Sequence, residues 1–515
     1  MPPIDLTKAT IVIGDANSPE DLAVRILREE VEKRTGIAWK VYTDWPGGRN
    51  LIALATRGSA KLAGRAVPRR KGDDLPEVRK EGYRLHVQRR PHGHVIVWIV
   101  GADRRGTLFG AGHLLRLLSL SKGSAKLPHP VDIATAPAYS IRGHQLGYRD
   151  TANSYDAWTV EQYERYIREL AIFGANCIEN IPLQDKTNVL MKLPRREMNK
   201  RISALCARYD VDYWVWTPAD FDLSNVSLRQ AAIEEHEQLC RDCRRLDGVF
   251  FPGGDPGNNH PRLVMPFLED LSKRLRARHP KAGIWISLQG FNRESVEYFF
   301  DYLKEHDPDW LAGVVAGPSS PPIDMTRARL PKKYKLRSYP DITHTVRCQF
   351  PVQKWDQAFA LTLGREPCNP RPNFYARIHN LYAPHTDGFL SYSDGVHDDV
   401  NKVVWTRRAW NPEEDVGQII LEYCRFFLGD DVAEDAAAGI FALERNWEGP
   451  LAANESVERT LDHWKSLEQR APHLTGNWRW QLLLLRAYYD AYQRRRLIHE
   501  RQLEREAMKA LAKVD

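Results

Sequence analysis

The chain has 515 residues, of which 43% are hydrophobic, and it contains 15 Trp and 20 Tyr. This length and composition suit about three globular domains and exclude a disordered or fibrous protein. The net charge of +7 arises from 74 basic and 67 acidic residues that are spread along the chain, so nucleic-acid binding is not expected. No stretch is apolar over the length that a membrane span requires, so no membrane partner is expected either.

The seven cysteines form no recognisable disulfide pattern, because most of them lie inside expected strands or helices. Cys240 and Cys243 make a single CxxC without a second pair or a histidine at zinc spacing, so we expect neither a metal nor another cofactor. The N-terminal stretch MPPIDLTKATIVIGD lacks a cationic segment followed by a long apolar run. As written, the chain is expected to be soluble and cytoplasmic, or periplasmic or secreted if a signal peptide has been removed.

Residues 1–135 are expected to form a small α/β domain. Its apolar runs predict strands at Ala9–Gly14 and Ile52–Ala55, two strands within Tyr83–Gly101, and an amphipathic helix at Pro19–Thr35. A further apolar helix follows Gly101. No group of residues in this region suggests a nucleophile, so we expect the domain to support its neighbour structurally.

Residues 138–425 alternate short apolar runs with helical patterns, as in a (β/α)8 TIM barrel. The eight predicted strands are Tyr139–Tyr148, Cys177–Ile181, Asp212–Thr217, Gly248–Gly253, Gly283–Gln289, Trp310–Ala316, Tyr334–Thr343 and Asp387–Ser393. Among the first six connections, only the sixth, Gly317–Lys333, lacks a helical pattern and is expected to be a loop that lines the cavity. An open doubly wound sheet is the alternative fold, but no Gly-rich phosphate loop follows the first strand.

The most informative stretch is GVFFPGGDPGNN, Gly248–Asn259, in which an apolar strand leads through paired glycines to Asp255. Catalytic groups of a barrel lie at this end of the strands, and glycines let the backbone approach a ligand closely. Asp255 is therefore the first candidate for a reacting group. A tight turn without a catalytic role is the alternative interpretation.

The other strand ends are rich in aromatic rings, amides, carboxylates and arginines. Flat rings stack on the apolar faces of sugars, and forked polar groups pair with sugar hydroxyls, so this composition predicts a carbohydrate as the partner. The predicted substrate-binding residues are Arg142, His144, Tyr148, Glu179, Trp214, Trp216, Gln289, Tyr339, His344, Arg347, Tyr392 and His397.

Several of these segments resemble known glycoside hydrolases. IRGHQLGYRD at strand one and PGGDPG at strand four are similar to the Arg-Gly opening and the Gly-Gly-Asp-Glu of family 20 β-hexosaminidases. This resemblance implies that Arg142 grips sugar hydroxyls, but the glutamate that acts as general acid in that family is Pro256 here. GADRRGTLFG resembles the domain that precedes the barrel in families 20 and 67. DDVNKVVWTRRAWNPEEDVGQIILEYCRFFLG resembles a segment of family 67 and family 115 α-glucuronidases.

Glycosidic cleavage needs two carboxyl groups, one as acid and one as base or nucleophile. The candidate catalytic residues are Asp255 as general acid, Asp341 as base or nucleophile, and Asp394 as an alternative base, with Glu179 and Glu366 behind them. We expect the N-terminal domain and the long polar loops to wall the cavity into a pocket, which predicts an exo-acting glycosidase that cleaves a terminal sugar. Strands four and seven lie across the barrel and leave room for a water, which predicts inversion. A uronic acid is one candidate substrate, because Arg142, Arg149 or Arg347 could hold its carboxylate.

Two other functional classes stay open. His344 beside Asp341, and the run from Asp394 through His397 to Asp399, contain the residue types of a metal-dependent lyase or hydrolase. Alternatively, Pro256 and the absence of an acid after strand six, at Gly317-Pro318-Ser319, favour a catalytically inactive barrel that binds carbohydrate.

Residues 426–515 are helical in pattern throughout. The tryptophans of this region are expected to form a core between helices. The final helix carries Leu497, Leu503, Met508 and Leu511 at helical spacing. We expect this helix to pack against the barrel or against a second copy of the chain, which would give a homodimer.

Overall fold

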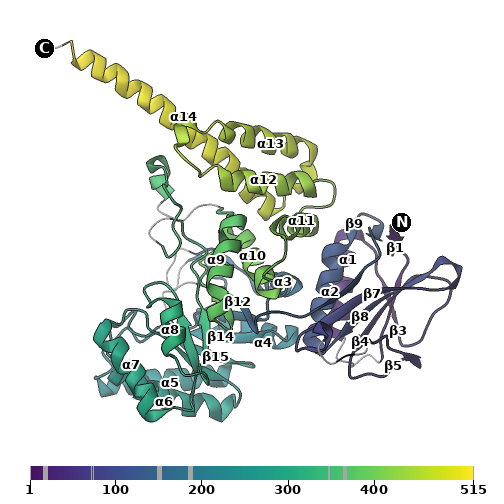
Figure 1. Ribbon diagram of the computed structural model, residues 1–515, viewed down its shortest axis with the longest axis horizontal. Helices are drawn as coiled ribbons and strands as arrows, with labels where there is room; N and C mark the ends of the chain where they lie inside the picture. Colours follow the sequence, from purple (N-terminus) through teal and green to yellow (C-terminus); the bar gives the residue numbers. More distant parts are fainter. Residues whose placement is uncertain are drawn as a thin grey trace. The chain divides into compact units, whose positions relative to one another are not determined.

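The structure is a computed structural model that describes residues 2–14, 21–70, 72, 75–147, 153–183, 189–345, 348–362 and 368–513 (Figure 1). The chain forms two compact units. The first comprises residues 1–340, 378–394 and 406–414, and the second comprises residues 341–377, 395–405 and 415–515. In the described residues, no helix combines the length and the apolar character needed to cross a membrane.

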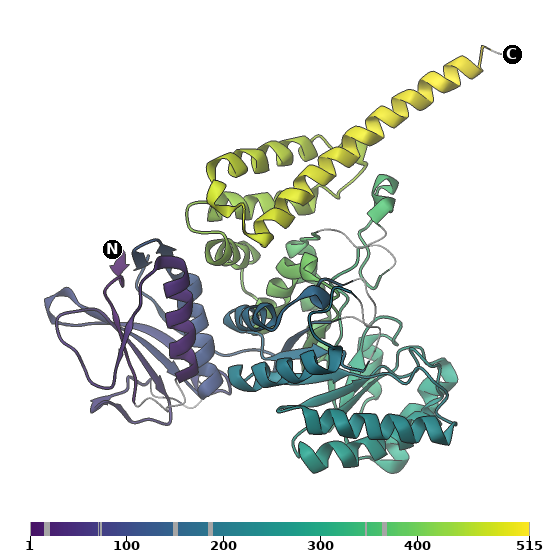
Figure 2. The same ribbon diagram turned by 180° about the vertical axis from the view of Figure 1, so that it is seen from behind.

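The first unit begins with a six-stranded sheet in the order β11-β7-β8-β4-β2-β3. Its strands are β2 (Thr10–Val12), β3 (Lys40–Tyr42), β4 (Leu51–Thr56), β7 (Tyr83–Arg89), β8 (Val95–Gly101) and β11 (Asp132–Thr135). The helices α1 (Asp21–Thr35) and α2 (Arg104–Leu117) lie side by side along this sheet (Figures 1 and 2). The Asp103 side chain accepts a hydrogen bond from the backbone N–H of Gly106 and so caps α2.

Two small β elements complete this region. β1 (Ile4–Asp5), β10 (Ser124–Leu127) and β9 (Ser119–Ser121) form a three-stranded sheet, and β5 (Lys61–Leu62) pairs with β6 (Arg65–Ala66). The α/β character predicted for the start of the chain is therefore confirmed.

The next eight strands form a closed parallel barrel. They are β12 (Ile141–Gln145), β13 (Cys177–Asn180), β14 (Asp212–Trp216), β15 (Gly248–Phe251), β16 (Gly283–Ser287), β17 (Leu311–Ala316), β18 (Lys335–Ser338) and β19 (Gly388–Ser391). β12 pairs with β19, with Ile141 opposite Gly388 and His144 opposite Ser391, which closes the barrel. Each strand lies within its predicted range, so the TIM-barrel prediction is confirmed.

Helices follow the barrel strands along the chain. They are α3 (Val160–Ile172), α4 (Arg195–Tyr209), α5 (Val226–Asp242), α6 (Pro261–Arg278), α7 (Arg293–His306), α8 (Ile323–Arg329), α9 (Pro372–Tyr382) and α10 (Asp399–Trp410). The expectation of a loop in the sixth connection is wrong, because α8 occupies part of it. The proline pair at Pro321 and Pro322 precedes α8, and proline is tolerated at a helix start.

The interior of the barrel is filled by side chains. A buried cluster includes Cys177, Trp214, Phe250, Trp285 and Leu390, one from each of five strands. Glycine is required at position 143, because a Cβ there would lie 2.2 Å from the Cys177 sulfur. This packing closes the middle of the barrel, so a ligand site can form only at the ends of the strands.

The second unit contains four further helices, α11 (Val416–Phe427), α12 (Ala433–Arg445), α13 (Ser456–Arg470) and α14 (Trp478–Leu511). Trp464 and Trp480 lie in edge-to-face contact between these helices with ring centroids 5.6 Å apart, as expected for core residues. The last turns of α14, residues 498–511, are exposed on every side and extend beyond α12 and α13 (Figure 2). The boundaries 1–135, 138–425 and 426–515 stay a prediction.

Candidate functional site at the ends of the barrel strands

Asp255 follows the fourth barrel strand through a tight Gly-Gly segment. Gly253 has a φ of +69°, and a Cβ there would lie 2.3 Å from the carbonyl oxygen of Ser287. Only glycine fits this conformation and this close approach. The Asp255–Pro256 peptide bond is cis. The segment therefore brings the end of β15 directly against the end of β16.

Gln289, which follows β16, holds the Asp255 side chain. Its Nε2 donates a hydrogen bond to Asp255 Oδ2 at 2.6 Å, and the backbone N–H of Gly254 donates to the Gln289 carbonyl at 2.9 Å. Asp255 and Gln289 are both partly exposed. The structure thus brings together two residues that were predicted separately, and it orients a carboxylate that solvent can reach.

A buried polar network lies inside the barrel, on residues of β12, β13 and β18 and on Tyr339 just after β18. Arg337 of β18 donates to Glu179 Oε2 at 2.8 Å, and Gln145 of β12 donates to Glu179 Oε1 at 3.0 Å. The same Gln145 nitrogen donates to the Tyr339 hydroxyl at 2.8 Å. If the Gln145 amide were flipped, its oxygen would face the Glu179 carboxylate oxygen and two acceptors would meet. The orientation with Nε2 toward Glu179 is therefore the one that forms a hydrogen bond. Both hydrogens of the amide nitrogen are used.

Burial governs the titration of this network. Complete burial raises the pKa of Glu179 to about 6, although the Arg337 charge and the hydrogen bonds from Gln145 and Arg337 act in the opposite direction. Burial also lowers the pKa of the Arg337 guanidinium, against the charge of Glu179. The side chains of Glu179 and Arg337 have no exposed surface. Neither charged group of this pair therefore presents a surface that a ligand could contact in this conformation.

Aromatic rings surround this network. The Arg337 guanidinium lies over the rings of Trp214 and Phe250 at 5.0 and 4.7 Å, and the rings of Tyr339 and Tyr392 meet edge to face at 5.8 Å. Trp216 belongs to the same inward-facing cluster. Tyr392 is partly exposed, whereas Trp214, Trp216 and Tyr339 are buried. Of the predicted Trp and Tyr rings that the structure describes, Tyr392 thus presents the most accessible surface.

Arg142 and His144 do not face the barrel interior, which corrects their prediction as substrate-binding residues. Arg142 donates to Glu81 at 2.7 Å and to the Gly174 and Tyr139 carbonyls at 2.9 and 2.8 Å. The imidazole of His144 contacts the hydroxyls of Ser391 and Thr406, both at 2.8 Å. Both side chains are fully buried. Successive strand residues point to opposite faces, so Gln145 points inward and these two point outward.

Asp341 and His344 lie together in the second unit, in a turn after β18. Asp341 Oδ1 accepts the backbone N–H groups of Thr343 and His344, each at 3.1 Å, and Oδ2 lies 3.1 Å from His344 Nδ1. His397 contacts the Thr343 hydroxyl at 2.9 Å. Both oxygens of the Asp341 carboxylate are therefore engaged by their own turn.

The acidic run after β19 is also largely engaged. Asp398 pairs with Lys402, and Asp399 pairs with Arg479 at 2.7 Å while it accepts the Tyr423 hydroxyl at 2.8 Å. Asp394 is buried in the first unit. Across the described ranges, no group of three or more His, Cys, Asp and Glu side chains could hold a metal ion. The predicted residues Tyr148, Arg347 and Glu366 lie outside the described residues, as does Arg149.

Sequence reasoning missed two members of the network, Gln145 and Arg337. The period-two pattern of the first strand could have identified Gln145, because it alternates with the small inward residue Gly143. Arg337 lies between Leu336 and Ser338 in a short strand, and nothing local indicates its partner Glu179, which is 158 residues away.

Comparisons with known proteins agree with this architecture. The sequence matches no protein-family model and no curated protein. In structure, the chain is similar to a β-hexosaminidase of Streptomyces plicatus in complex with the product GlcNAc, at 12% identity and a TM-score of 0.54, over 85% of this chain and 93% of that one. It is also similar to a Flavobacterium johnsoniae chitobiase, at 14% identity and a TM-score of 0.55, over 90% of this chain and 75% of that one. A third similar structure is that of CpGH84B, at 14% identity and a TM-score of 0.59, over 99% of this chain and 91% of that one.

These similarities define the class of fold. The protein is a (β/α)8 barrel with a preceding α/β region and a helical C-terminal region, an architecture that it shares with structures of glycoside hydrolase families 20 and 84. The resemblance to family 20 that the strand-one and strand-four segments suggest is confirmed at the level of architecture.

Proposed function

We propose that this protein is an exo-acting glycoside hydrolase that removes a terminal sugar. The observation that carries the proposal is Asp255, a partly exposed carboxylate after the fourth barrel strand that is oriented by Gln289 at 2.6 Å. The general acid must be accessible to the glycosidic oxygen, and it must be held in place. Of the other candidates, Glu179, Asp341 and Asp394 are all buried and so are less suited to this role, and Glu366 lies outside the described residues.

In this proposal Asp255 acts as the general acid. The hydrogen bond from Gln289 holds the Asp255 carboxyl group in place, so that it can exchange a proton with the leaving oxygen. In the family 20 pattern, the acid is the residue after this aspartate, and Pro256 cannot take that role because it has no ionisable group. The proton must therefore come from Asp255 itself or from a carboxyl group on another strand.

Asp394 is our preferred second carboxyl group. It follows β19 in the same compact unit as Asp255, whereas Asp341 belongs to the other unit and is engaged within its own turn. Inversion would need the two carboxyl groups to stand about 6.5–9.5 Å apart, and retention about 5–5.5 Å. We keep inversion as the expected outcome.

The comparisons do not support a uronic acid as the substrate. Two of the three compared structures are a β-hexosaminidase with GlcNAc and a chitobiase. Arg142, one of the arginines suggested for a uronate, is buried in contacts with Glu81 and backbone carbonyls. A neutral terminal sugar, with N-acetylhexosaminides as the first test, is therefore the substrate class that we propose.

The test is the Asp255→Asn variant against a panel of chromogenic glycosides in both anomeric configurations. We expect turnover to fall by about two to four powers of ten, the usual contribution of positioned proton transfer, while the fold is retained. The loss should be smaller for substrates with an acidic leaving group. Asp220→Asn, at an exposed aspartate in the loop after β14, is the matched control and should leave turnover unchanged.

Normal turnover at saturation with weaker sugar binding would make Asp255 a binding residue and would contradict its role as acid. If the wild type cleaves no glycoside but still binds an oligosaccharide, the inactive carbohydrate-binding barrel replaces the hydrolase. Loss of activity after chelation, with recovery on adding a divalent metal, would instead support the metal-dependent alternative.

A further inference from the structure

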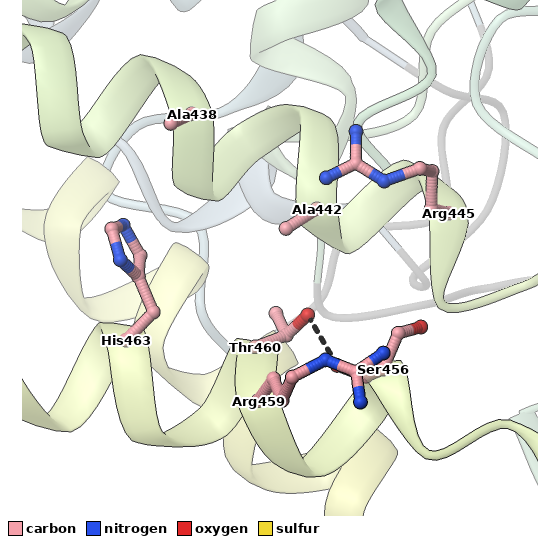
Figure 3. Close-up of a pocket in the computed structure, with 7 residues that line it drawn as sticks. All are labelled: Ala438, Ala442, Arg445, Ser456, Arg459, Thr460 and His463. Carbon is pink, nitrogen blue, oxygen red and sulfur yellow. Dashed lines mark hydrogen bonds between the residues drawn. The ribbon is translucent and has the colours of Figure 1, made fainter.

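A cavity of about 330 Å³ lies between α12 and α13 in the second unit (Figure 3). One face of each helix forms its wall, because the lining residues recur at spacings of three and four. They are Ala438, Ala442 and Arg445 from α12, and Ser456, Arg459, Thr460 and His463 from α13. The two alanines open the space between the helices, since a larger side chain at either position would occupy it.

The charge of this cavity is positive. Arg445 and Arg459 come from the two opposite helices, and in the part of the chain that the structure describes neither guanidinium lies within 4 Å of a carboxylate. Neighbouring acids are engaged elsewhere: Asp435 pairs with Arg470, and Glu458 pairs with Arg494 and Arg495. Both side chains are exposed, so the rim of the cavity carries two cations whose charges no described acid neutralises by direct contact.

Local hydrogen bonds define what the remaining groups can do. The Thr460 hydroxyl donates to the Ser456 carbonyl at 2.9 Å, so its hydrogen is used within the helix. His463 Nε2 lies 2.8 Å from the Asp435 carbonyl, which can only accept, so Nε2 carries a hydrogen. α13 starts at Ser456 without a side-chain cap from Glu455, and its first turn adds the positive end of a helix dipole.

We propose that this cavity binds an anionic group, either a free inorganic oxyanion or the carboxylate of a substituted sugar. Guanidinium forks pair with two oxygens of such groups, and two forks from different helices can hold one anion between them. The alanine methyls and the Thr460 side chain form an apolar floor that suits the carbon skeleton of a small ligand. This site is separate from the barrel, and it does not depend on the hydrolase activity.

The test is a calorimetric or NMR titration of the full chain with sodium phosphate, sodium sulfate, sodium glucuronate and, as the uncharged control, glucose. Ionic strength is held constant with NaCl, because surface charges are screened by salt. We expect saturable binding of at least one anion and none of glucose. A preference for phosphate or sulfate identifies a free oxyanion, and a preference for glucuronate identifies a substituted sugar.

Variants separate this site from general attraction to a basic protein. Arg445→Gln combined with Arg459→Gln should weaken anion binding by at least roughly tenfold. Ala442→Leu should weaken it as well, because it fills the cavity without a change of charge. Arg505→Gln, on the exposed end of α14, is the charge-matched control and should have no effect. Equal binding by the wild type and the double variant, or no saturable binding of any anion, would overturn the proposal.

Discussion

Two buried glutamates of the first unit, Glu81 and Glu179, each pair with arginine, yet their pKa values are shifted in opposite directions. Burial would raise the pKa of Glu81, but the charges of Arg142 and Arg105 outweigh it and hold the pKa at about 2. Burial raises the pKa of Glu179 to about 6, because Arg337 is the one arginine that opposes it. Glu81 also accepts hydrogen bonds from Asn176 at 3.1 and 3.2 Å.

The difference teaches that a buried ion pair is not a single kind of interaction. At Glu81, two cations and several donors keep the carboxylate charged, so the site behaves as a structural clamp. At Glu179, a single cation in the packed barrel interior leaves the charged and neutral forms close in free energy near pH 6. The barrel interior therefore contains an acid that can change its protonation state near pH 6.

The largest expected effect is on the clamp. Glu81→Gln should lower the free energy of unfolding by about 3–5 kcal/mol at pH 7, because it leaves Arg142 buried without its counter-charge. Chemical denaturation measures this loss. Asp132→Asn, which breaks the more exposed pair with Arg84, is the matched control and should cost about 0–1 kcal/mol. Equal losses in the two variants would show that Glu81 is not a clamp.

The next effect depends on pH. The pKa of Glu179 in the folded protein, about 6, exceeds its ordinary value of 4.5, so the wild type loses stability as pH rises from about 4.5 to about 6. Glu179→Gln cannot lose this proton. Its stability relative to the wild type should therefore improve by about 2 kcal/mol across that window, the free energy that corresponds to the pKa difference. Denaturation at pH 5 and pH 7.5 checks this sign.

A pH-independent difference between the two proteins would mean that Glu179 keeps an ordinary pKa. Glu81 should show the opposite sign, because its pKa is depressed. The stability that it contributes is present above pH 4.5 and is lost as pH falls toward 2.

The smallest expected effect concerns the hydrogen bond between Gln145 and the Tyr339 hydroxyl. Tyr339→Phe removes the acceptor for Gln145 and should cost about 0.5–1.5 kcal/mol of stability. Thermal unfolding measures the loss, and Tyr298→Phe on the exposed face of α7 is the control. A loss well above this range would show that the Tyr339 hydroxyl contributes more to stability than this one hydrogen bond.

The fold was accessible from sequence because its signals are local. Eight apolar runs and the helical spacing between most of them predicted the barrel, and the closing pair of β12 and β19 confirms it. α8 was missed because it is short and because the prolines before it suggest a loop until they are placed at its N-terminal end.

The candidate site was accessible only in part. Asp255 and Gln289 were predicted from strand ends, since turn chemistry and strand position are encoded nearby. Their direct contact was not predicted, because register between neighbouring strands depends on the closed barrel. Arg142 was misassigned because a motif was followed without regard to which face of the strand each residue occupies. The pairing of Glu179 with Arg337 is a long-range contact that no local pattern encodes.

The contacts of Arg142 also show that the α/β region and the barrel share buried charges. Its guanidinium, on the first barrel strand, is neutralised by Glu81 from the preceding α/β region and lies over Phe109 of α2 at 5.4 Å. Arg105 of α2 likewise pairs with Asp212 of β14, the third barrel strand. Without the α/β region, the barrel would lose Glu81, and the buried Arg142 guanidinium would have no counter-charge from it. The two regions therefore depend on each other for charge balance, and removal of the α/β region is expected to destabilise the barrel.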